Sequence, residues 1–407
     1  MPEQWVPEKS LPEQVQPERA TRPHGMRTSG PLFDLWGRAR AGPAIRKAVQ
    51  VDLFSPLTLG DIELANRVVM APLPRTRAAA AGGPGELGAE HYAQRASLGL
   101  IITEGTYPSA ESRAYPGQPG IVTPEQVEGW RRVAEAVHAR GGRIVMQLMN
   151  GGRVSHTEIT GTDRIVAPSA IAIDGEVRTP NGKLPYPVPH ELTTAELAEV
   201  REEFVDAARR AIEAGLDGVE IHGANGYLLH EFLSPVSNQR TDEYGGSPAA
   251  RARFVVEVTA AVAEAIGAGR VGVRLSPAHN IQDVVETDEA DVRATYDAVA
   301  DGLAPLGLAY LSVLHADPEG ALVQDLRARF GGAFIANSGF SSVTTREEAL
   351  NLVGQGNADA VAVGRLAIAN PDLVERWQGD HPENEPNPAT FYGEGAVGYT
   401  DYPRLSA

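Results

Sequence analysis

From residue 51 onward, short runs of apolar, β-branched residues alternate with stretches whose apolar positions recur at helical spacing. This alternation is typical of strand–helix units that build a parallel sheet. The runs are almost continuously hydrophobic, which indicates strands buried on both faces. The eight predicted strands are Val68–Ala71, Leu100–Glu104, Arg143–Leu148, Gly218–His222, Val271–Ser276, Ala309–Val313, Ala333–Asn337 and Ala360–Gly364.

Amphipathic segments between these strands carry helix start signals. Ser247 places a capping hydroxyl before Pro248 at the first helical position, and Thr344 has a glutamate three residues later, the spacing of a capping box. Eight tandem units predict a closed (β/α)₈ TIM barrel rather than an open sheet. The predicted helices include Thr123–Arg140, Thr193–Ala214, Pro248–Ile266, Asp288–Leu303 and Thr344–Gly354.

Two segments do not follow the repeating pattern. Residues 1–50 are rich in Pro, Glu and Gln and then become basic, which predicts a partly disordered N-terminal extension, with a docking helix or a functional arm as alternatives. The barrel itself is expected to span residues 51–407. Arg153–Leu192 is rich in Pro, Gly and Thr, and we expect it to form an insertion after the third strand that caps the active site.

Composition narrows the class of protein. The 407 residues are 42% hydrophobic and 22% charged, ordinary values for a folded chain with one large core. A formal net charge of −17 disfavours nucleic-acid and anionic-membrane partners. The absence of Cys excludes disulfides, thiolate nucleophiles and cysteine-ligated metals. With no apolar run long enough for a membrane span and no secretory leader, a cytoplasmic enzyme with a small-molecule substrate, monomeric or homodimeric, is expected.

Chemistry in this fold lies at the carboxyl ends of the strands. Gly339 and Gly364 follow the last two strands, where backbone N–H groups commonly bind phosphate, and Arg365 adds a fixed positive charge. Gln147 and Arg274 offer donors to a ring that carries carbonyl and nitrogen acceptors. Each residue alone is better explained as a turn or as part of the barrel mouth, so the joint placement carries the functional interpretation.

The end of the fourth strand offers a different chemistry. His222 and Asn225 are three residues apart, so both can donate to a single oxygen, and Tyr227 supplies a phenolic proton two residues later. The alternative is structural, because an asparagine at such a position often satisfies the backbone groups of a tight turn.

Several separated motifs resemble the Old Yellow Enzyme family of FMN-dependent ene-reductases. The resemblance extends from Leu53 to Tyr402. Its most specific parts are Asn66–Leu73, Asp217–Tyr227, Ser237–Ser247, Val363–Arg365 with Ile368–Leu373, and Thr390–Pro403.

The resemblance implies a set of FMN contacts. The isoalloxazine edge would pack against the backbone of Pro72, Leu73, Pro74 and Gly105, and Gln147 would bond the pyrimidine side. Arg274 would stabilise the anionic reduced ring near its N1–C2 carbonyl region. The phosphate would be held by Ser338, Gly339, Gly364 and Arg365.

The resemblance also implies a reaction. His222 and Asn225 would bind the carbonyl oxygen of an α,β-unsaturated carbonyl compound, and Tyr227 would protonate its α-carbon after flavin N5 delivers hydride to the β-carbon. Met149 would line the substrate side and Tyr392 would fold back over the mouth. NAD(P)H would re-reduce the flavin, and no metal is expected.

The chain departs from the family pattern around the substrate. Pro74 stands where many members have a threonine that bonds flavin O4, which predicts weaker stabilisation of the reduced ring. Met149 and Asn150 replace a common Trp-His pair, which predicts a more adaptable substrate wall. An enzyme dedicated to a biosynthetic intermediate is one hypothesis consistent with these changes.

Three other functions are considered. A flavin-dependent isomerase, dehydrogenase or demethylating oxidase would use the same barrel and differ in its consumption of NAD(P)H. A metal-dependent lyase or hydrolase lacks ligands, because only His222 and Glu104 stand out at strand ends. A non-catalytic flavin-binding or scaffold protein is disfavoured by Tyr227.

Overall fold

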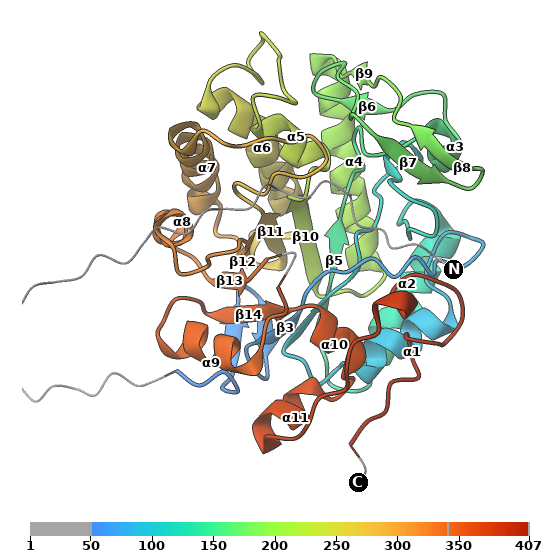
Figure 1. Ribbon diagram of the computed structural model, residues 1–407, viewed down its shortest axis with the longest axis vertical. Helices are drawn as coiled ribbons and strands as arrows, with labels where there is room; N and C mark the ends of the chain where they lie inside the picture. Colours follow the sequence, from blue (N-terminus) through green and yellow to red (C-terminus); the bar gives the residue numbers. More distant parts are fainter. Residues whose placement is uncertain (1–50, 340–341, 406–407) are drawn as a thin grey trace, which may run out of the picture. The chain divides into compact units, whose positions relative to one another are not determined.

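Eight parallel strands close into a barrel in the computed structural model, which describes residues 51–339 and 342–405 (Figure 1). The predicted TIM barrel is therefore confirmed, and the observed strand ends differ from the predicted ones by at most two residues. The strands, in chain order around the barrel, are β3 Val68–Met70, β4 Leu100–Ile102, β5 Ile144–Leu148, β10 Gly218–Gly223, β11 Val271–Leu275, β12 Tyr310–Leu314, β13 Phe334–Asn337 and β14 Ala360–Val363.

Helices surround the barrel, as Figure 1 shows. The α-helices outside the capping insertion are α1 Glu86–Gln94, α2 Pro124–His138, α4 Thr194–Glu213, α5 Leu228–Leu233, α6 Pro248–Ile266, α7 Glu289–Leu303, α8 Ala321–Phe330, α9 Arg346–Gly354, α10 Arg365–Ala369 and α11 Leu373–Gly379. Short 3₁₀ turns are η1 Ala110–Ser112, η2 Ala268–Arg270, η3 Ala304–Leu306 and η4 Pro388–Thr390. No helix in the described part of the chain is long and apolar enough to cross a membrane.

One of the two predicted helix caps is confirmed and the other is wrong by one residue. The Ser247 side chain accepts a hydrogen bond from the backbone N–H of Ala250, with Pro248 at the first helical position. At α9 the cap is Thr345, which accepts from the N–H of Glu348. Thr344 cannot cap, because its hydroxyl bonds the Ser338 hydroxyl at 2.7 Å.

Side-chain alternation along the strands builds two apolar layers. Val69 packs inside the barrel, whereas Val68 and Met70 pack toward the helices. The interior layer also contains Leu59 and Ile62, from a hairpin of β1 Leu57–Leu59 and β2 Ile62–Leu64. This hairpin meets the segment just before β11, since the N–H of Asp61 donates to the Gly269 carbonyl at 2.8 Å. It therefore covers the amino-terminal end of the barrel.

The predicted insertion after the third barrel strand is confirmed. It contains α3 Thr157–Thr160 and two small sheets, one pairing β6 Val166–Ala167 with β9 His190–Glu191, the other pairing β7 Glu176–Thr179 with β8 Gly182–Pro185. Arg240 anchors the β6–β9 sheet of the insertion, because its guanidinium donates to the carbonyls of Pro168 and Leu192, which directly follow these two strands. Asp242 holds that guanidinium in place. Within the run Ser237–Ser247, Arg240 and Asp242 therefore have a structural role.

Candidate functional site

The site residues predicted from the sequence lie at the carboxyl ends of the barrel strands, with one addition from the C-terminal tail. They leave seven of the eight strands and converge on one mouth. They are Pro72, Leu73 and Pro74 after β3, Gly105 after β4, Gln147 and Met149 at the end of β5, His222, Asn225 and Tyr227 at and after β10, Arg274 on β11, Ser338 and Gly339 after β13, and Gly364 and Arg365 after β14, with Tyr392 from the tail.

Polar atoms without protein partners collect at this mouth. Buried polar atoms in proteins almost always have a hydrogen-bond partner. Here Arg274 Nε, His222 Nδ1, Asn225 Oδ1, Tyr115 Oη and Gln282 Oε1 are buried and make no hydrogen bond. Such a set of donors and acceptors matches the hydrogen-bonding groups of a flavin ring and of a carbonyl substrate. The residues at the mouth are therefore suited to bind FMN.

The floor of the mouth is a polar network on adjacent strands. Arg274 donates to Ser312 Oγ at 3.2 Å and to Asn337 Oδ1 at 2.8 Å, and both partners are neutral. Gln147 donates to the buried carboxyl of Glu220 at 2.8 Å. Burial lowers the pKa of Arg274 from its usual value, against the effect of Glu220. The two predicted ring-binding side chains are therefore held rigidly before any ligand arrives.

The predicted phosphate end is built from backbone rather than hydroxyl groups. The Ser338 hydroxyl bonds that of Thr344 at 2.7 Å and its backbone carbonyl accepts the Ser342 hydroxyl at 2.8 Å, so the backbone N–H is the group that Ser338 would offer to a phosphate. Gly339 has φ +108°, a conformation that favours glycine. A Cβ on Gly364 would lie 3.4 Å from Leu73, so the predicted ring edge and phosphate loop are neighbours. Arg365 begins α10 and is half-buried.

His222, Asn225 and Tyr227 come together as predicted. The His222 and Tyr227 rings lie 5.5 Å apart between centroids. Asn225 adopts φ +58°, and this left-handed turn is held by the loop after β11. The Asn225 N–H donates to Ser276 Oγ at 2.9 Å, and Gln282 Nε2 donates to the Asn225 carbonyl at 2.9 Å. Through this turn, Asn225 and Tyr227, which are two residues apart, both contribute to the site.

Burial sets the protonation of this group. It holds the pKa of His222 well below its usual range, so the imidazole is neutral and has one N–H to donate. Burial also raises the pKa of the Tyr227 phenol above its usual value of about 10, with the Tyr186 phenol adding to the effect. Tyr227 therefore keeps its proton at neutral pH.

A small apolar cluster surrounds Tyr227. Met149 and Ile173 pack with it, and Tyr115 and Tyr186 pack against the cluster. A Cβ on Gly105 would lie 2.7 Å from Met149 Sδ, so the predicted flavin contact and the predicted substrate wall touch. Ile173 and Tyr186 come from the capping insertion, which therefore helps to form the pocket.

Two aromatic members of this wall were missed from the sequence. Tyr115 lies in the Pro- and Gly-rich loop before Ile121, and Tyr186 directly follows β8. Loop composition marked both segments as irregular, but no periodic pattern shows where a loop side chain points. Asn150 differs from the expectation for the wall, because its Oδ1 accepts the N–H of Gly152 at 2.9 Å within its own loop.

The segment around Pro74 is anchored on both sides. Glu104 accepts the backbone N–H groups of Arg75 at 2.8 Å and Thr76 at 3.2 Å. Arg75 and Arg77 then hold the C-terminal tail through backbone carbonyls, including that of Phe391. Tyr392, next to Phe391, is 41% exposed, as a residue at the rim of the mouth would be.

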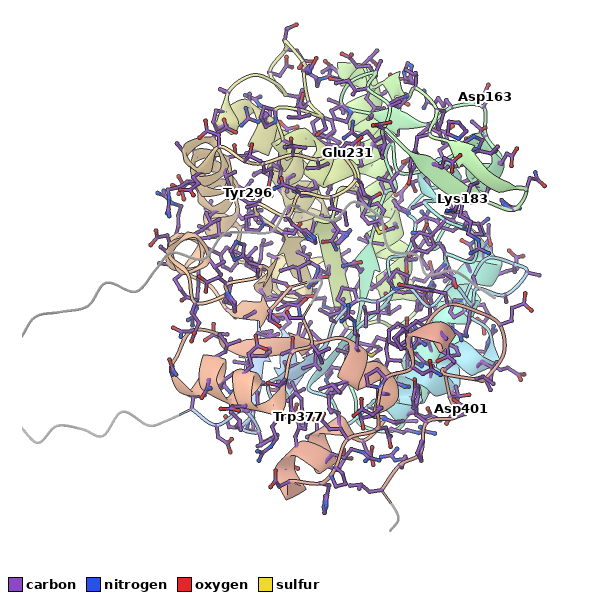
Figure 2. All side chains as sticks on the ribbon, viewed as in Figure 1. Asp163, Lys183, Glu231, Tyr296, Trp377 and Asp401 are labelled. Carbon is purple, nitrogen blue, oxygen red and sulfur yellow. The ribbon has the colours of Figure 1, made fainter. Side chains whose placement is uncertain are left out.

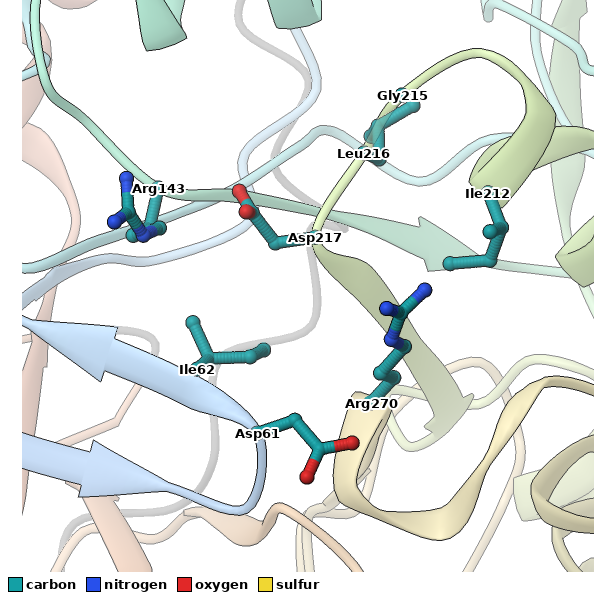
Figure 3. A pocket seen from close by; sticks show the side chains of 8 residues that line it. All are labelled: Asp61, Ile62, Arg143, Ile212, Gly215, Leu216, Asp217 and Arg270. Carbon is teal, nitrogen blue, oxygen red and sulfur yellow. The ribbon is translucent and has the colours of Figure 1, made fainter.

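A cavity of about 320 Å³ lies at the opposite end of the barrel (Figure 3). Arg143, Asp217 and Arg270 in its lining directly precede β5, β10 and β11, and no lining residue was predicted as a site residue. Asp217 in this cavity already accepts from His138 Nε2 at 2.9 Å and from the Ile144 N–H at 2.7 Å. The lining is Asp61, Ile62, Arg143, Ile212, Gly215, Leu216, Asp217 and Arg270.

Comparison with known proteins decides the family. Residues 52–384 match the NADH:flavin oxidoreductase / NADH oxidase family. The chain belongs to this family. It is 44% identical to a probable flavin mononucleotide-dependent alkene reductase of Leishmania infantum, over 88% of this chain and 99% of that protein. It is 41% identical to 12-oxophytodienoate reductase 7 of Oryza sativa subsp. japonica, over 90% and 98%.

Solved structures agree with this assignment. Morphinone reductase is 43% identical, covers 88% of this chain and 97% of its own, and superposes with a TM-score of 0.81. The old yellow enzyme homologue from Zymomonas mobilis is 39% identical, covers 87% and 100%, and gives 0.82. The resemblance to the Old Yellow Enzyme family is confirmed, the family uses FMN, and a metal-dependent lyase or hydrolase is no longer a candidate.

Proposed function

We propose that this enzyme uses FMN, re-reduced by NADH or NADPH, to reduce the carbon–carbon double bond of an α,β-unsaturated carbonyl compound. The observation that carries this proposal is the buried, unpartnered Nδ1 of the neutral His222 ring beside the protonated phenol of Tyr227, with the Asn225 side-chain amide on the same short segment. Relatives described as alkene, 12-oxophytodienoate and morphinone reductases support it, as does a morphinone reductase structure in complex with tetrahydroNAD.

The residues of the mouth would hold FMN in two parts. Gln147 and Arg274 would bond the pyrimidine ring, with Pro72–Pro74 and Gly105 along the ring edge. The backbone of Ser338, Gly339 and Gly364 would hold the phosphate, with Arg365 as its positive partner. When bound and reduced, FMN supplies the hydride for the reaction.

His222 and Asn225 would bind the substrate carbonyl oxygen. As the β-carbon gains hydride, enolate charge develops on that oxygen, and donors fixed beforehand stabilise it there. Neutral His222 is suited to this, because it donates one N–H without adding a charge to a buried site. Tyr227 would then give its proton to the α-carbon, a step that its raised pKa makes compatible with neutral pH.

Pro74, Met149 and the insertion residues bear on the substrate. Pro74 brings no side-chain donor to the flavin edge, and Met149 with Tyr115 and Tyr186 forms an apolar, partly flexible wall. An enzyme dedicated to a biosynthetic intermediate is the hypothesis that the departures at Pro74, Met149 and Asn150 suggest. Turnover of simple cyclic enones at ordinary rates would argue against such dedication.

Location and assembly are further parts of the proposal. NAD(P)H-dependent reduction of a small molecule fits a cytoplasmic enzyme, acting as a monomer or homodimer. The barrel would span residues 51–407. The proposed extension, residues 1–50, lies outside the described residues. Cell fractionation and gel filtration would test these points.

The central experiment measures both halves of the reaction. The purified protein should carry a yellow flavin, NADH or NADPH should bleach it anaerobically, and an enone should restore the colour. One NAD(P)H consumed per product would distinguish reduction from isomerisation. A colourless protein that takes up no FMN would contradict the proposal, and product formed without NAD(P)H consumption would favour the isomerase.

A further inference from the structure

Glu220 is a buried carboxyl inside the barrel for which the proposed reaction has no use. It lies at the middle of β10 and is fully buried. Alternate residues of a strand share a face, so Glu220 and His222 point to the same side, while Val219 and Ile221 pack toward the helices. Since carboxylates are rarely buried without a specific task, the partners of Glu220 are informative.

Both carboxyl oxygens of Glu220 accept a hydrogen bond. Oε1 accepts from Gln147 Nε2 at 2.8 Å, and Oε2 accepts from the Tyr310 hydroxyl at 3.1 Å. An ionised carboxyl can only accept, so the Gln147 amide must direct its nitrogen to Glu220. This fixes the amide, and its oxygen and remaining N–H keep one orientation toward the mouth.

Glu220 also acts on the charge of Arg274. Its strand β10 pairs with β5, which carries Gln147, and with β11, which carries Arg274, so Glu220 stands between the two predicted ring contacts. Arg274 makes its own hydrogen bonds to neutral groups. Burial raises the pKa of Glu220, whereas Arg274 and the hydrogen bonds from Gln147 and Tyr310 favour its charged form, and Glu220 in turn favours the charge of Arg274. Glu220 is thus the negative charge that offsets Arg274.

We propose that Glu220 is a positioning residue that lowers the reduction potential of bound FMN, by fixing the Gln147 amide and by offsetting the positive charge of Arg274. Reduction places negative charge on the flavin ring, which Arg274 favours and a nearby carboxylate disfavours. The effect is appreciable because the groups are buried and poorly screened. A lower potential makes hydride transfer to the substrate more favourable. This proposal rests on FMN occupying the mouth as set out above.

The test is the substitution Glu220→Gln, which keeps the shape and removes the charge. Its amide can still accept from Gln147 and donate to the Tyr310 oxygen. The ratio of affinities for reduced over oxidised FMN should rise about tenfold, which is a potential about 30 mV more positive for a two-electron couple. Equilibrium reduction against a reference dye measures this. Glu220→Asp keeps the charge and should stay closer to the wild-type potential.

Glu286→Gln is the matched control. Glu286 is also buried and accepts the hydroxyl of a tyrosine, Tyr296, at 3.1 Å, yet it lies outside the barrel strands, in the loop before α7. Its removal should leave the potential unchanged. If Glu220→Gln does not fold, Tyr310→Phe tests the proposal instead. This variant removes the hydrogen bond that favours the charged carboxylate of Glu220, so the potential of bound FMN should become more positive, by less than in Glu220→Gln.

Three results would overturn the role of Glu220. They are an unchanged potential in Glu220→Gln, an equal shift in Glu220→Asp, or, where Glu220→Gln does not fold, an unchanged potential in Tyr310→Phe. A wild-type protein that binds no FMN would instead contradict the proposed function. The two failures are therefore distinguishable in the same set of measurements.

Discussion

Two arginines at opposite ends of one strand have opposite surroundings. Arg270 directly precedes β11, is exposed, and lines the cavity at the amino-terminal face of the barrel. Arg274, near the carboxyl end of β11, is 3% exposed, is held by Ser312 and Asn337, and retains an unpartnered Nε. Arg270 is therefore a charge on the surface, whereas Arg274 is held in place with a free N–H that can donate to a ligand.

The difference extends to the two ends of the barrel. At the amino-terminal end, Leu59 and Ile62 cover the core, and Asp217 is already satisfied by His138 and the Ile144 N–H. At the carboxyl end, buried donors and acceptors remain unpaired. A cavity alone therefore does not identify the functional end here. Unsatisfied buried polarity does, as expected for a site that a ligand completes.

The largest effect is expected from Tyr227→Phe. Loss of the proton donor should slow reoxidation of the reduced flavin by an enone about 10²–10⁴-fold, the usual contribution of general acid catalysis. Flavin reduction by NAD(P)H should be unaffected, because that step needs no substrate proton. Stopped-flow traces of the two half-reactions separate these rates. Equal reoxidation rates in wild type and variant would remove Tyr227 from the mechanism.

A somewhat smaller effect is expected from His222→Ala. Removing one of two donors to the developing oxyanion should lower the rate of enone reduction about 10²–10³-fold. His138→Ala, at the opposite end of the barrel where His138 bonds Asp217, is the matched control and should leave this rate intact. A comparable loss in both variants would show that the comparison between the two ends is wrong.

Glu231 tests the stability cost of unsatisfied polarity near the site. Glu231 is buried on α5, and in Figure 2 its label lies well inside the outline of the molecule. Asp163 and Lys183, which are exposed on the insertion, are labelled toward the right edge. Only one of the Glu231 carboxyl oxygens has a partner, the N–H of Arg153 at 2.9 Å. Burial raises the pKa of Glu231 to about 8 from the usual 4.5, against the effect of Arg153.

The sign of the pH effect follows from this raised pKa. Between pH 4.5 and pH 8 the folded protein keeps a proton that the unfolded chain loses, so the free energy of unfolding falls as pH rises through this range. Glu231→Gln removes the penalty and should gain roughly 3 kcal/mol at pH 7 and little at pH 5. Thermal melts across this range measure it. Glu199→Gln, at an exposed site on α4, should show no such trend, and a pH-independent gain in Glu231→Gln would contradict the account.

The fold was largely predictable because hydrophobic periodicity is a local property. Strand β10 was predicted to within one residue, and the capping insertion was placed in the correct connection. The cap of α9 was misplaced by one residue, because Thr344 is used by Ser338 from another segment. The hairpin of β1 and β2 was not recognised, since its strands have only three residues each.

From the sequence, only those site residues could be predicted that lie at the ends of strands or within recognisable motifs. His222, Asn225 and Tyr227 lie on one segment, so their proximity follows from the sequence. Glu220 was not predicted, because its role depends on which strands lie beside β10. Tyr186 was missed because the insertion brings it to Tyr227 through tertiary packing.

The most direct test of the central claim is FMN binding to two matched variants. Apoprotein carrying Arg274→Gln should bind FMN at least about tenfold more weakly than wild type, since a hydrogen bond from a charged, buried donor contributes roughly 1.5–3 kcal/mol. Arg270→Gln, at the other end of the same strand, should bind FMN as the wild type does. Equal affinities for all three proteins, or a loss confined to Arg270→Gln, would contradict the assignment of the flavin to the carboxyl end of the barrel.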